Sequence, residues 1–353
     1  MSRIFAITIL ATIFATAAVI QGCAAGGTSG DGAIGPWVET SCTDGDYQHF
    51  ASLLPGFVRS FEIAVTPTTR NMSTGDFDLE ETVSQARAIG DNLHIILLCS
   101  FGDPATNLYD YRRLVDFADR ASMGISLSLD IRSLPDGYDF SNSQIRQTYL
   151  DEVEGLVDEY PPDYFNLCME MNAYALDDAT KSDYHNLVSL YEEAYDLVEY
   201  LSPNTVTYCS HSWELDLLHV LESPVSLLTD LGNRLDAAGI STFPQLAGIE
   251  EPSEIPGIYF QDLPHYVSVP IIVECGFSDD SAYGSSEAIA RDFPPQLIRA
   301  LGDLNLSLIQ LVEMHDLPAT GLDPLFHQMG LRRLDGSAKP IYCGWQFIAD
   351  SGT

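Results

Sequence analysis

Short apolar runs alternate with longer amphipathic segments along most of the chain. The apolar runs are rich in Ile, Val, Leu and aromatic residues and have the length of buried β-strands. Eight of them occur, at Phe57–Thr66, His94–Cys99, Ile125–Asp130, Tyr164–Glu170, Thr205–Ser210, Ala238–Phe243, Pro270–Cys275 and Ser307–Glu313. Helical spacing of apolar residues marks Leu79–Ile89, Tyr109–Ala121, Gln144–Glu159, Ser182–Leu201, Pro224–Asp236, Glu287–Leu301, Pro324–Leu331 and Pro340–Ala349, and more weakly Gly257–His265.

This order of elements predicts an α/β fold, a single (β/α)8 TIM barrel. Eight strand-then-helix units are its pattern, and no low-complexity linker divides residues 37–353. A doubly wound open sheet is the alternative. Such a sheet usually has a glycine-rich phosphate loop after its first strand, and Thr66–Arg70 contains no glycine.

The N-terminus has the pattern of an export signal. Arg3 precedes an apolar run from Ile4 to Ile20, and Gln21-Gly22 leads to Cys23. Residues 1–22 resemble a bacterial lipoprotein signal peptide, which implies that Cys23 is lipidated. A retained transmembrane anchor is the alternative. Residues 23–36 are small and glycine-rich and predict a flexible tether. Ala24 favours the outer membrane if the host has one.

Charge narrows the possible partners. The chain has 16 Lys+Arg against 51 Asp+Glu, a formal net charge of −35, and only two lysines, Lys181 and Lys339. A surface with so few cations has no patch for phosphates, so we expect no nucleic-acid partner and membrane contact only through the lipid anchor. Hydrophobic residues make up 46% of the chain, which argues against disorder. The oligomeric state stays open.

Six further cysteines follow Cys23. Four lie at or near the ends of apolar runs, and no CxxC pair suggests zinc or redox chemistry. We therefore interpret these four as small buried residues: Cys99, Cys168, Cys209 and Cys275. A disulfide between Cys42 and Cys343 is possible, and the sequence leaves it undecided.

Two carboxylates end predicted strands. Glu170 ends the fourth run and Glu274 comes directly after four apolar residues in the seventh. In a TIM barrel the C-terminal strand ends form the active-site mouth, and alternation points both side chains into it, Glu170 together with Asn166 and Cys168. Glycoside cleavage needs such a pair: one carboxyl gives a proton to the leaving oxygen, and the other is ionised to attack or stabilise the oxocarbenium-like centre.

At these strands the sequence resembles the clan of retaining glycoside hydrolases built on (β/α)8 barrels. The matching motifs are Met169-Glu170-Met171-Asn172 and Ile271-Ile272-Val273-Glu274-Cys275-Gly276-Phe277, with Gly330–Pro340 similar to the segment before the last helix. Ser241-Thr242-Phe243-Pro244 is similar to endo-galactanase-like members. The resemblance implies that Glu170 is the acid/base and Glu274 the nucleophile.

Three positions depart from the clan. Met169 stands where an asparagine holds the sugar 2-hydroxyl, with Asn172 as a candidate substitute. The strand-six tyrosine that touches the nucleophile falls near Phe243, which has no hydroxyl. Glu313-Met314-His315-Asp316 replaces the strand-eight tryptophan. Two outcomes remain open: a divergent enzyme, or a barrel that has lost efficient turnover.

Besides Asn172 and Phe243, five more residues are candidates for substrate binding. His211 and Trp213 follow the fifth run and could hold and stack a sugar, or serve as loop anchors. Asp130 could line the mouth or pair with Arg132. Glu313 and His315 could reach a substrate or form an internal hydrogen-bonded pair.

Other chemistries lack their signatures. No HxH, HExxH or GxSxG motif occurs, and neither lysine lies on a predicted strand. We therefore expect no metal and no cofactor. The sequence predicts an extracytoplasmic glycoside hydrolase that cleaves a β-linked poly- or oligosaccharide with retention. The alternative is a non-catalytic glycan-binding surface lipoprotein on the same barrel, and the acidic groove favours neutral glycans.

Overall fold

A computed structural model describes most of the chain after residue 41. The described residues are 42–67, 79–98, 104–131, 139–176, 180–218, 224–317 and 324–352. The predicted signal peptide, the tether and the lipidation site Cys23 lie outside them, as do Cys99 and Arg132. Within the described ranges, no helix is long and apolar enough to cross a membrane.

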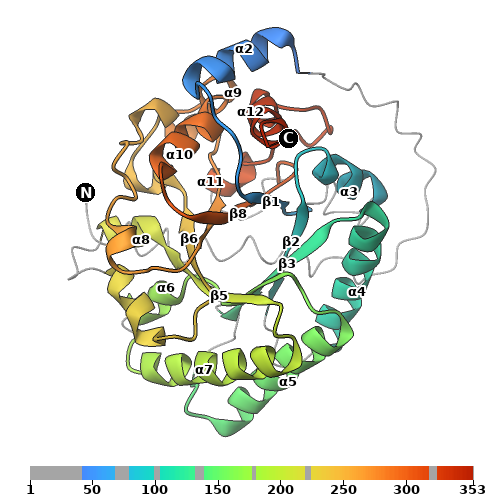
Figure 1. Cartoon of the computed structure of the whole chain (residues 1–353), viewed down its shortest axis with the longest axis vertical. Coiled ribbons are helices and arrows are strands. Elements are labelled where there is room, and N and C mark those ends of the chain that lie inside the picture. Colours follow the sequence, from blue (N-terminus) through green and yellow to red (C-terminus); the bar gives the residue numbers. More distant parts are fainter. Residues whose placement is uncertain are drawn as a thin grey trace.

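Eight parallel strands form a closed barrel in which each strand pairs with its sequence neighbour and β1 pairs with β8. Figure 1 shows these strands as a ring with α3, α4, α5 and α7 outside it. The strands are β1 (Glu62–Val65), β2 (Asn92–Leu98), β3 (Gly124–Asp130), β4 (Tyr164–Cys168), β5 (Val206–Ser212), β6 (Ala237–Thr242), β7 (Ile271–Cys275) and β8 (Leu306–Leu311). The predicted single (β/α)8 barrel is confirmed.

Helices cover the outside of the barrel. The α-helices are α2 (Asp44–Leu53), α3 (Leu79–Arg87), α4 (Pro104–Ala121), α5 (Ser143–Glu159), α6 (Met171–Leu176), α7 (Tyr184–Leu201), α8 (Trp213–Leu218), α9 (Glu287–Ala290), α10 (Phe293–Leu301), α11 (Pro324–His327) and α12 (Pro340–Asp350). The 3₁₀ helices are η4 (Pro224–Leu231), η5 (Pro244–Ala247), η6 (Pro252–Glu254), η7 (Leu263–His265) and η8 (Ser281–Tyr283).

Four predicted helices differ in the structure. Within Gly257–His265 only the 3₁₀ helix η7 forms, and the segment predicted at Pro324–Leu331 ends at His327 as α11. The segment predicted at Pro224–Asp236 is the 3₁₀ helix η4, and the one at Glu287–Leu301 is divided into α9 and α10. Pro294 and Pro295 explain the division, because proline lacks the N–H that a continuous helix requires and is tolerated in a first helical turn. The helices α2, α6 and α8 were not predicted.

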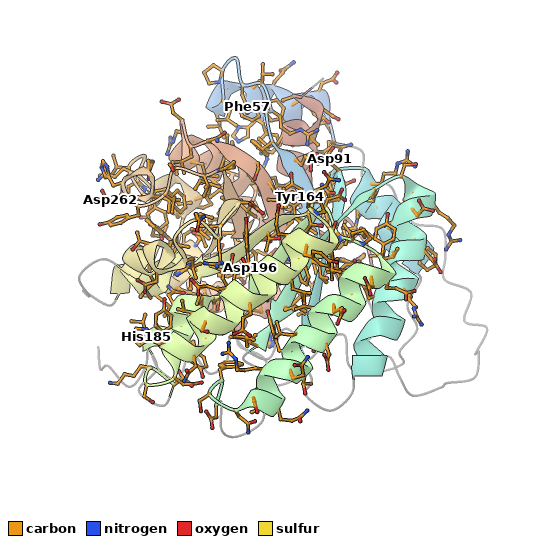
Figure 2. The ribbon with its side chains drawn as sticks, turned by 60° about the horizontal axis from the view of Figure 1, so that its bottom comes forward. Phe57, Asp91, Tyr164, His185, Asp196 and Asp262 are labelled. Carbon is orange, nitrogen blue, oxygen red and sulfur yellow. A yellow bond between two sulfur atoms is a disulfide. The ribbon has the colours of Figure 1, made fainter. Side chains whose placement is uncertain are left out.

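Aspartates at the N-terminal ends of β2, β4 and β6 bind the backbone of the strand before. Asp91 accepts from the N–H of Ile63 at 2.9 Å, and Asp163 accepts from that of Ile125 at 2.9 Å. Asp236 accepts from the N–H of Thr207 in β5 at 2.9 Å. Asp91 and Tyr164, the latter the first residue of β4, are labelled in Figure 2. These carboxylates satisfy amides at the end of the barrel opposite the strand C-termini.

The barrel interior contains a buried histidine rather than only apolar side chains. His94 is fully buried, with Nδ1 3.1 Å from the Thr66 hydroxyl and Nε2 3.0 Å from the Ser128 hydroxyl. Burial lowers the pKa of His94 to about 3, so the ring is neutral at physiological pH. Since TIM barrels are usually filled by branched aliphatic residues, this interior is unusually polar.

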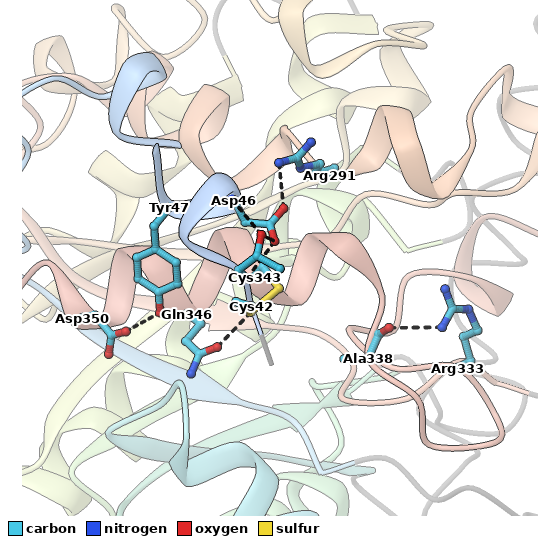
Figure 3. The surroundings of a disulfide bond; sticks show 10 residues. Cys42, Asp46, Tyr47, Arg291, Arg333, Ala338, Cys343, Gln346 and Asp350 are labelled. Carbon is cyan, nitrogen blue, oxygen red and sulfur yellow. Dashed lines mark hydrogen bonds and ion pairs between the residues drawn. A yellow bond between two sulfur atoms is a disulfide. The ribbon is translucent and has the colours of Figure 1, made fainter. Parts of the chain in front are cut away.

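The chain is cross-linked near both ends of the described region. Cys42, just before α2, forms a disulfide with Cys343 in the first turn of α12. Figure 3 shows supporting contacts of α2: Asp46 with Arg291, and the Tyr47 hydroxyl with Asp350. The pairing that the sequence left undecided is therefore present. Of the four cysteines predicted to be buried, the three within the described residues are buried: Cys168, Cys209 and Cys275.

Candidate active site

Glu170 follows β4 in an unusual backbone conformation. The pairing of β4 with β5 shifts register between Asn166 and Cys168, as at a β-bulge. Glu170 then adopts φ = 48°, a left-handed conformation that costs energy for a residue with a side chain. Its N–H donates to the Ser210 hydroxyl at 3.1 Å, which also accepts from the Asn166 amide at 3.0 Å. The strained backbone is therefore held by β5.

The bulge corrects one sequence-based inference. Strict alternation predicted that Cys168 shares the inward face with Asn166 and Glu170. In the register of β4 with β5, Cys168 instead lies opposite Cys209. Both thiols are close to Tyr191 of α7, on the outside of the barrel. One extra residue in a strand moves the following side chains to the other face.

Glu274 on β7 is flanked by polar residues on both neighbouring strands. Its register partners are Ser241 on β6 and Gln310 on β8. The Ser241 hydroxyl donates to Glu274 Oε2 at 3.3 Å. Gln310 Nε2 donates to the Ser126 hydroxyl and, at 2.7 Å, to the hydroxyl of Tyr208. Neighbouring strands thus fix the surroundings of this carboxylate.

The two glutamates lie at the same end of the barrel. Glu170 lies just after the C-terminal end of β4, and Glu274 is the next-to-last residue of β7. In the barrel, β5 and β6 lie between these two strands. Both residues are 4% exposed. Asp130, the last residue of β3, is 1% exposed at the same end. Buried carboxyl groups at the C-terminal ends of barrel strands are suited to proton transfer and to stabilising a developing positive charge.

The side chain of Asn172 is bonded to β5. Its Nδ2 donates to the Ser212 carbonyl at 2.9 Å, and the Ser212 N–H donates to its Oδ1 at 2.8 Å. This reciprocal pair joins the start of α6 to the end of β5. The geometry therefore places Asn172 in a positioning role for the segment after Glu170, and its substitution for the missing asparagine stays a prediction.

His211 and Trp213 pack against protein. His211 shares a face of β5 with Cys209, which lies near α7, and neither ring nitrogen has a hydrogen-bond partner within the described part of the chain. Trp213 is 4% exposed and packs against Tyr259 and Phe260, with ring centroids 6.4 and 5.3 Å away. Both side chains are therefore buried within the protein, and contact of either with a sugar stays a prediction.

Phe243 belongs to a small apolar cluster beyond the ends of β6 and β8. It is 2% exposed and meets Phe326 edge-on with ring centroids 5.4 Å apart. Val312 and Met329 complete its contacts, and a Cβ on Gly276 would lie 2.6 Å from Val312 Cγ2. The glycine two residues after Glu274 therefore allows this cluster to pack directly on the chain that follows β7.

Glu313 corrects another inference. β8 ends at Leu311, and Glu313 lines a small cavity between the barrel and its outer helices, with Phe293 and Trp345. Neither carboxyl oxygen has a hydrogen-bond partner among the described residues, which contradicts one of the two open alternatives, the internal hydrogen-bonded pair with His315. Burial raises the pKa of Glu313 well above its usual range. His315 is 1% exposed, and a substrate role for either residue is untested.

The structure adds a buried acid that sequence reasoning missed. Glu214 in α8 is fully buried and accepts from the Thr242 hydroxyl at 2.7 Å, the Phe243 N–H at 2.9 Å and the Tyr259 hydroxyl at 3.0 Å. Burial raises the pKa of Glu214 to about 7, against the opposing effect of these donors. Its donors are 28 to 45 positions away, so no local pattern marked it.

Metal binding has no support in the described part of the chain. No group of three or more His, Cys, Asp or Glu side chains within those ranges could hold an ion.

No protein-family model matches the chain, and no curated protein matches it. Solved glycoside hydrolases have similar folds. A GH5_18 protein from Bifidobacterium longum subsp. infantis has a TM-score of 0.65 and 17% identity, over 83% of this chain and 78% of that one. GH5_18 from Streptomyces cattleya in complex with GlcNAc has a TM-score of 0.64 and 13% identity, over 84% of this chain and 80% of that one. The exo-β-1,4-mannosidase Op5Man5 from Opitutaceae bacterium strain TAV5 has a TM-score of 0.62 and 13% identity, over 85% of this chain and 61% of that one. The chain shares the barrel fold of these enzymes.

Proposed function

We propose that this protein is a retaining glycoside hydrolase that cleaves a β-linked poly- or oligosaccharide. The observation that carries the proposal is the placement of Glu170 and Glu274, two buried carboxyl groups at the C-terminal ends of β4 and β7. Glycoside hydrolysis with retention uses two carboxyl groups, one as acid/base and one as nucleophile. The fold shared with solved glycoside hydrolases supports the same conclusion.

Glu170 is the proposed acid/base. In the first step it gives its proton to the departing sugar oxygen, and in the second it removes a proton from the attacking water. The left-handed backbone at Glu170, held through Ser210, supports this role, because strain is commonly retained where a side chain must be aimed at a reacting group.

Glu274 is the proposed nucleophile. It attacks the anomeric carbon to form a glycosyl ester, which water then hydrolyses. The hydrogen bond from the Ser241 hydroxyl holds one of its carboxyl oxygens. This hydroxyl acts from the strand on which the clan's tyrosine was expected, two residues before Phe243.

A second candidate function is glycan binding without cleavage. The specific observation behind it is Phe243, whose ring has no hydroxyl and packs into the apolar cluster with Phe326. A barrel that lacks this contact to its nucleophile could keep a sugar-binding mouth and lose turnover. Binding and cleavage therefore have to be measured on the same polymers.

The experiment measures reducing-sugar release by a soluble chain that begins at residue 24. The panel contains β-mannans, β-glucans, β-galactans, xylans and the disaccharide Manβ1-4GlcNAc, which is the ligand of a structurally similar GH5_18 protein. We expect release from one polymer class, lost in Glu274→Gln. Binding without release from any member would instead support the second candidate.

We also propose that the protein is exported and lipid-anchored at Cys23. The Cys42–Cys343 disulfide supports export, because disulfides persist in oxidising compartments. The lipoprotein-like segment at residues 1–22 supports the anchor. Mass spectrometry of the membrane-bound protein should find Cys23 as an acylated N-terminal residue, and a chain that keeps residues 1–22 would contradict the lipid anchor.

A further inference from the structure

One of the two lysines in the chain is buried between the segments that follow β7 and β8. Lys339 is 2% exposed. Its Nζ lies 2.8 Å from Asp279 Oδ2, contacts Asp316 Oδ1 and donates to the Gln328 carbonyl at 3.3 Å. Asp279 comes shortly after Glu274, and Asp316 follows β8. The ammonium group of Lys339 thus joins the segment that follows β7 to the segment that follows β8.

The charges make this bridge necessary for the local structure. Burial raises the pKa of both Asp279 and Asp316, the latter to about 6, while Lys339 acts in the opposite direction on both. Glu313 is a third buried carboxyl close to Asp316. Without Lys339, no cation described in contact with Asp316 would remain, and an unpaired buried charge is strongly unfavourable.

The segment after β7 is also held from the β6 side. Gln245 Nε2 donates to the Ser278 carbonyl at 2.8 Å, and the Ser278 N–H donates to Gln245 Oε1 at 2.7 Å. The Asp279 N–H donates to the Gln328 carbonyl at 3.1 Å. Residues 276–279 are therefore fixed on one side by an amide and on the other by the Lys339 bridge.

We propose that Lys339 is a positioning residue for Glu274. Its ammonium group fixes residues 276–279 relative to β8 and so holds the carboxylate at the end of β7 in its reactive place. The role assigned to Glu274 rests on the proposed function, whereas the bridge and its effect on residues 276–279 do not. The experiment therefore has one readout that needs no activity and one that does.

Four proteins are compared. The first is the wild type, and the second is Lys339→Arg, which keeps the charge. The third combines Lys339→Met with Asp279→Asn and Asp316→Asn, which removes the bridge without leaving unpaired buried charge. The fourth is Lys181→Met, a matched control at the other, exposed lysine.

Amide hydrogen exchange is the readout that needs no activity. In the triple variant we expect residues 276–279 to exchange about 10-fold faster or more, because a fixed segment that loses its cross-link opens more often. Lys181→Met should match the wild type, and Lys339→Arg should lie between. Unchanged exchange at residues 276–279 in the triple variant would overturn the proposal.

Steady-state kinetics on the polymer that the wild type cleaves is the second readout. We expect kcat to fall about 10-fold or more in the triple variant with KM little changed, and to be partly restored in Lys339→Arg, because misplacing a nucleophile affects chemistry more than binding. Faster exchange with unchanged kcat would overturn the positioning role. A wild type that cleaves nothing would defeat the proposed function, while exchange would still decide whether the bridge fixes residues 276–279.

Discussion

The disulfide between Cys42 and Cys343 closes a loop of 301 residues, and its removal should lower the free energy of unfolding substantially. In the chain-entropy model the constraint on the unfolded state grows with the logarithm of loop length, which gives about 6 kcal/mol at 25 °C for a loop of this size. Measured effects are commonly about 2–5 kcal/mol. Both cysteines are only partly buried, so serine at each position adds little packing cost.

The assay is urea unfolding of the wild type and of the double variant Cys42→Ser/Cys343→Ser, followed by circular dichroism. We expect the double variant to lose about 2–6 kcal/mol. The wild type with its disulfide reduced is the control, and it should unfold at the same urea concentration as the double variant. A loss below about 1 kcal/mol would refute the reasoning. It would mean that the cross-link scarcely restricts the unfolded chain.

Two further predictions concern single carboxylates. Asp163→Ala should lower the free energy of unfolding by about 1 kcal/mol, because the Ile125 N–H loses its acceptor, while the exposed Asp158→Ala should have no effect in the same urea titration. The pKa of Glu214, raised by burial to about 7, lies above the usual value of 4.5, so the stability that it contributes is present below pH 4.5 and is lost as the pH rises through 7. Unfolding midpoints measured from pH 5 to 8 should fall less in Glu214→Gln than in the wild type, and parallel curves would contradict this assignment.

Much of the fold was predictable because buried parallel strands have a plain sequence signature. Runs such as Ile271–Val273 are apolar on both faces, and each of the eight predicted runs overlaps one strand. Helix boundaries were less certain. The helices α6 and α8 are short and directly follow strands, so their residues were included in strand ends or loops.

The site was predictable only as far as strand order fixes it. The sequence placed Glu170 and Glu274 at one end of the barrel because both follow apolar runs. It misjudged Cys168, since a β-bulge is not visible in the spacing of apolar residues, and Glu313, since β8 ends before it. Glu214 and Lys339 depend on partners distant in sequence, which only the tertiary structure brings together.

The central claim is that Glu274 forms a covalent bond to the sugar. The most direct test is to incubate the active enzyme with a 2-deoxy-2-fluoro glycoside of the cleaved sugar that carries a dinitrophenolate leaving group. The fluorine slows both oxocarbenium-like steps, and the good leaving group restores only the first, so the glycosyl ester accumulates. Peptide mass spectrometry then locates the label. We predict one sugar per chain, attached to Glu274, and faster loss of the label when an acceptor glycoside is added. An active enzyme that carries no label, or a label on another residue, would contradict the account.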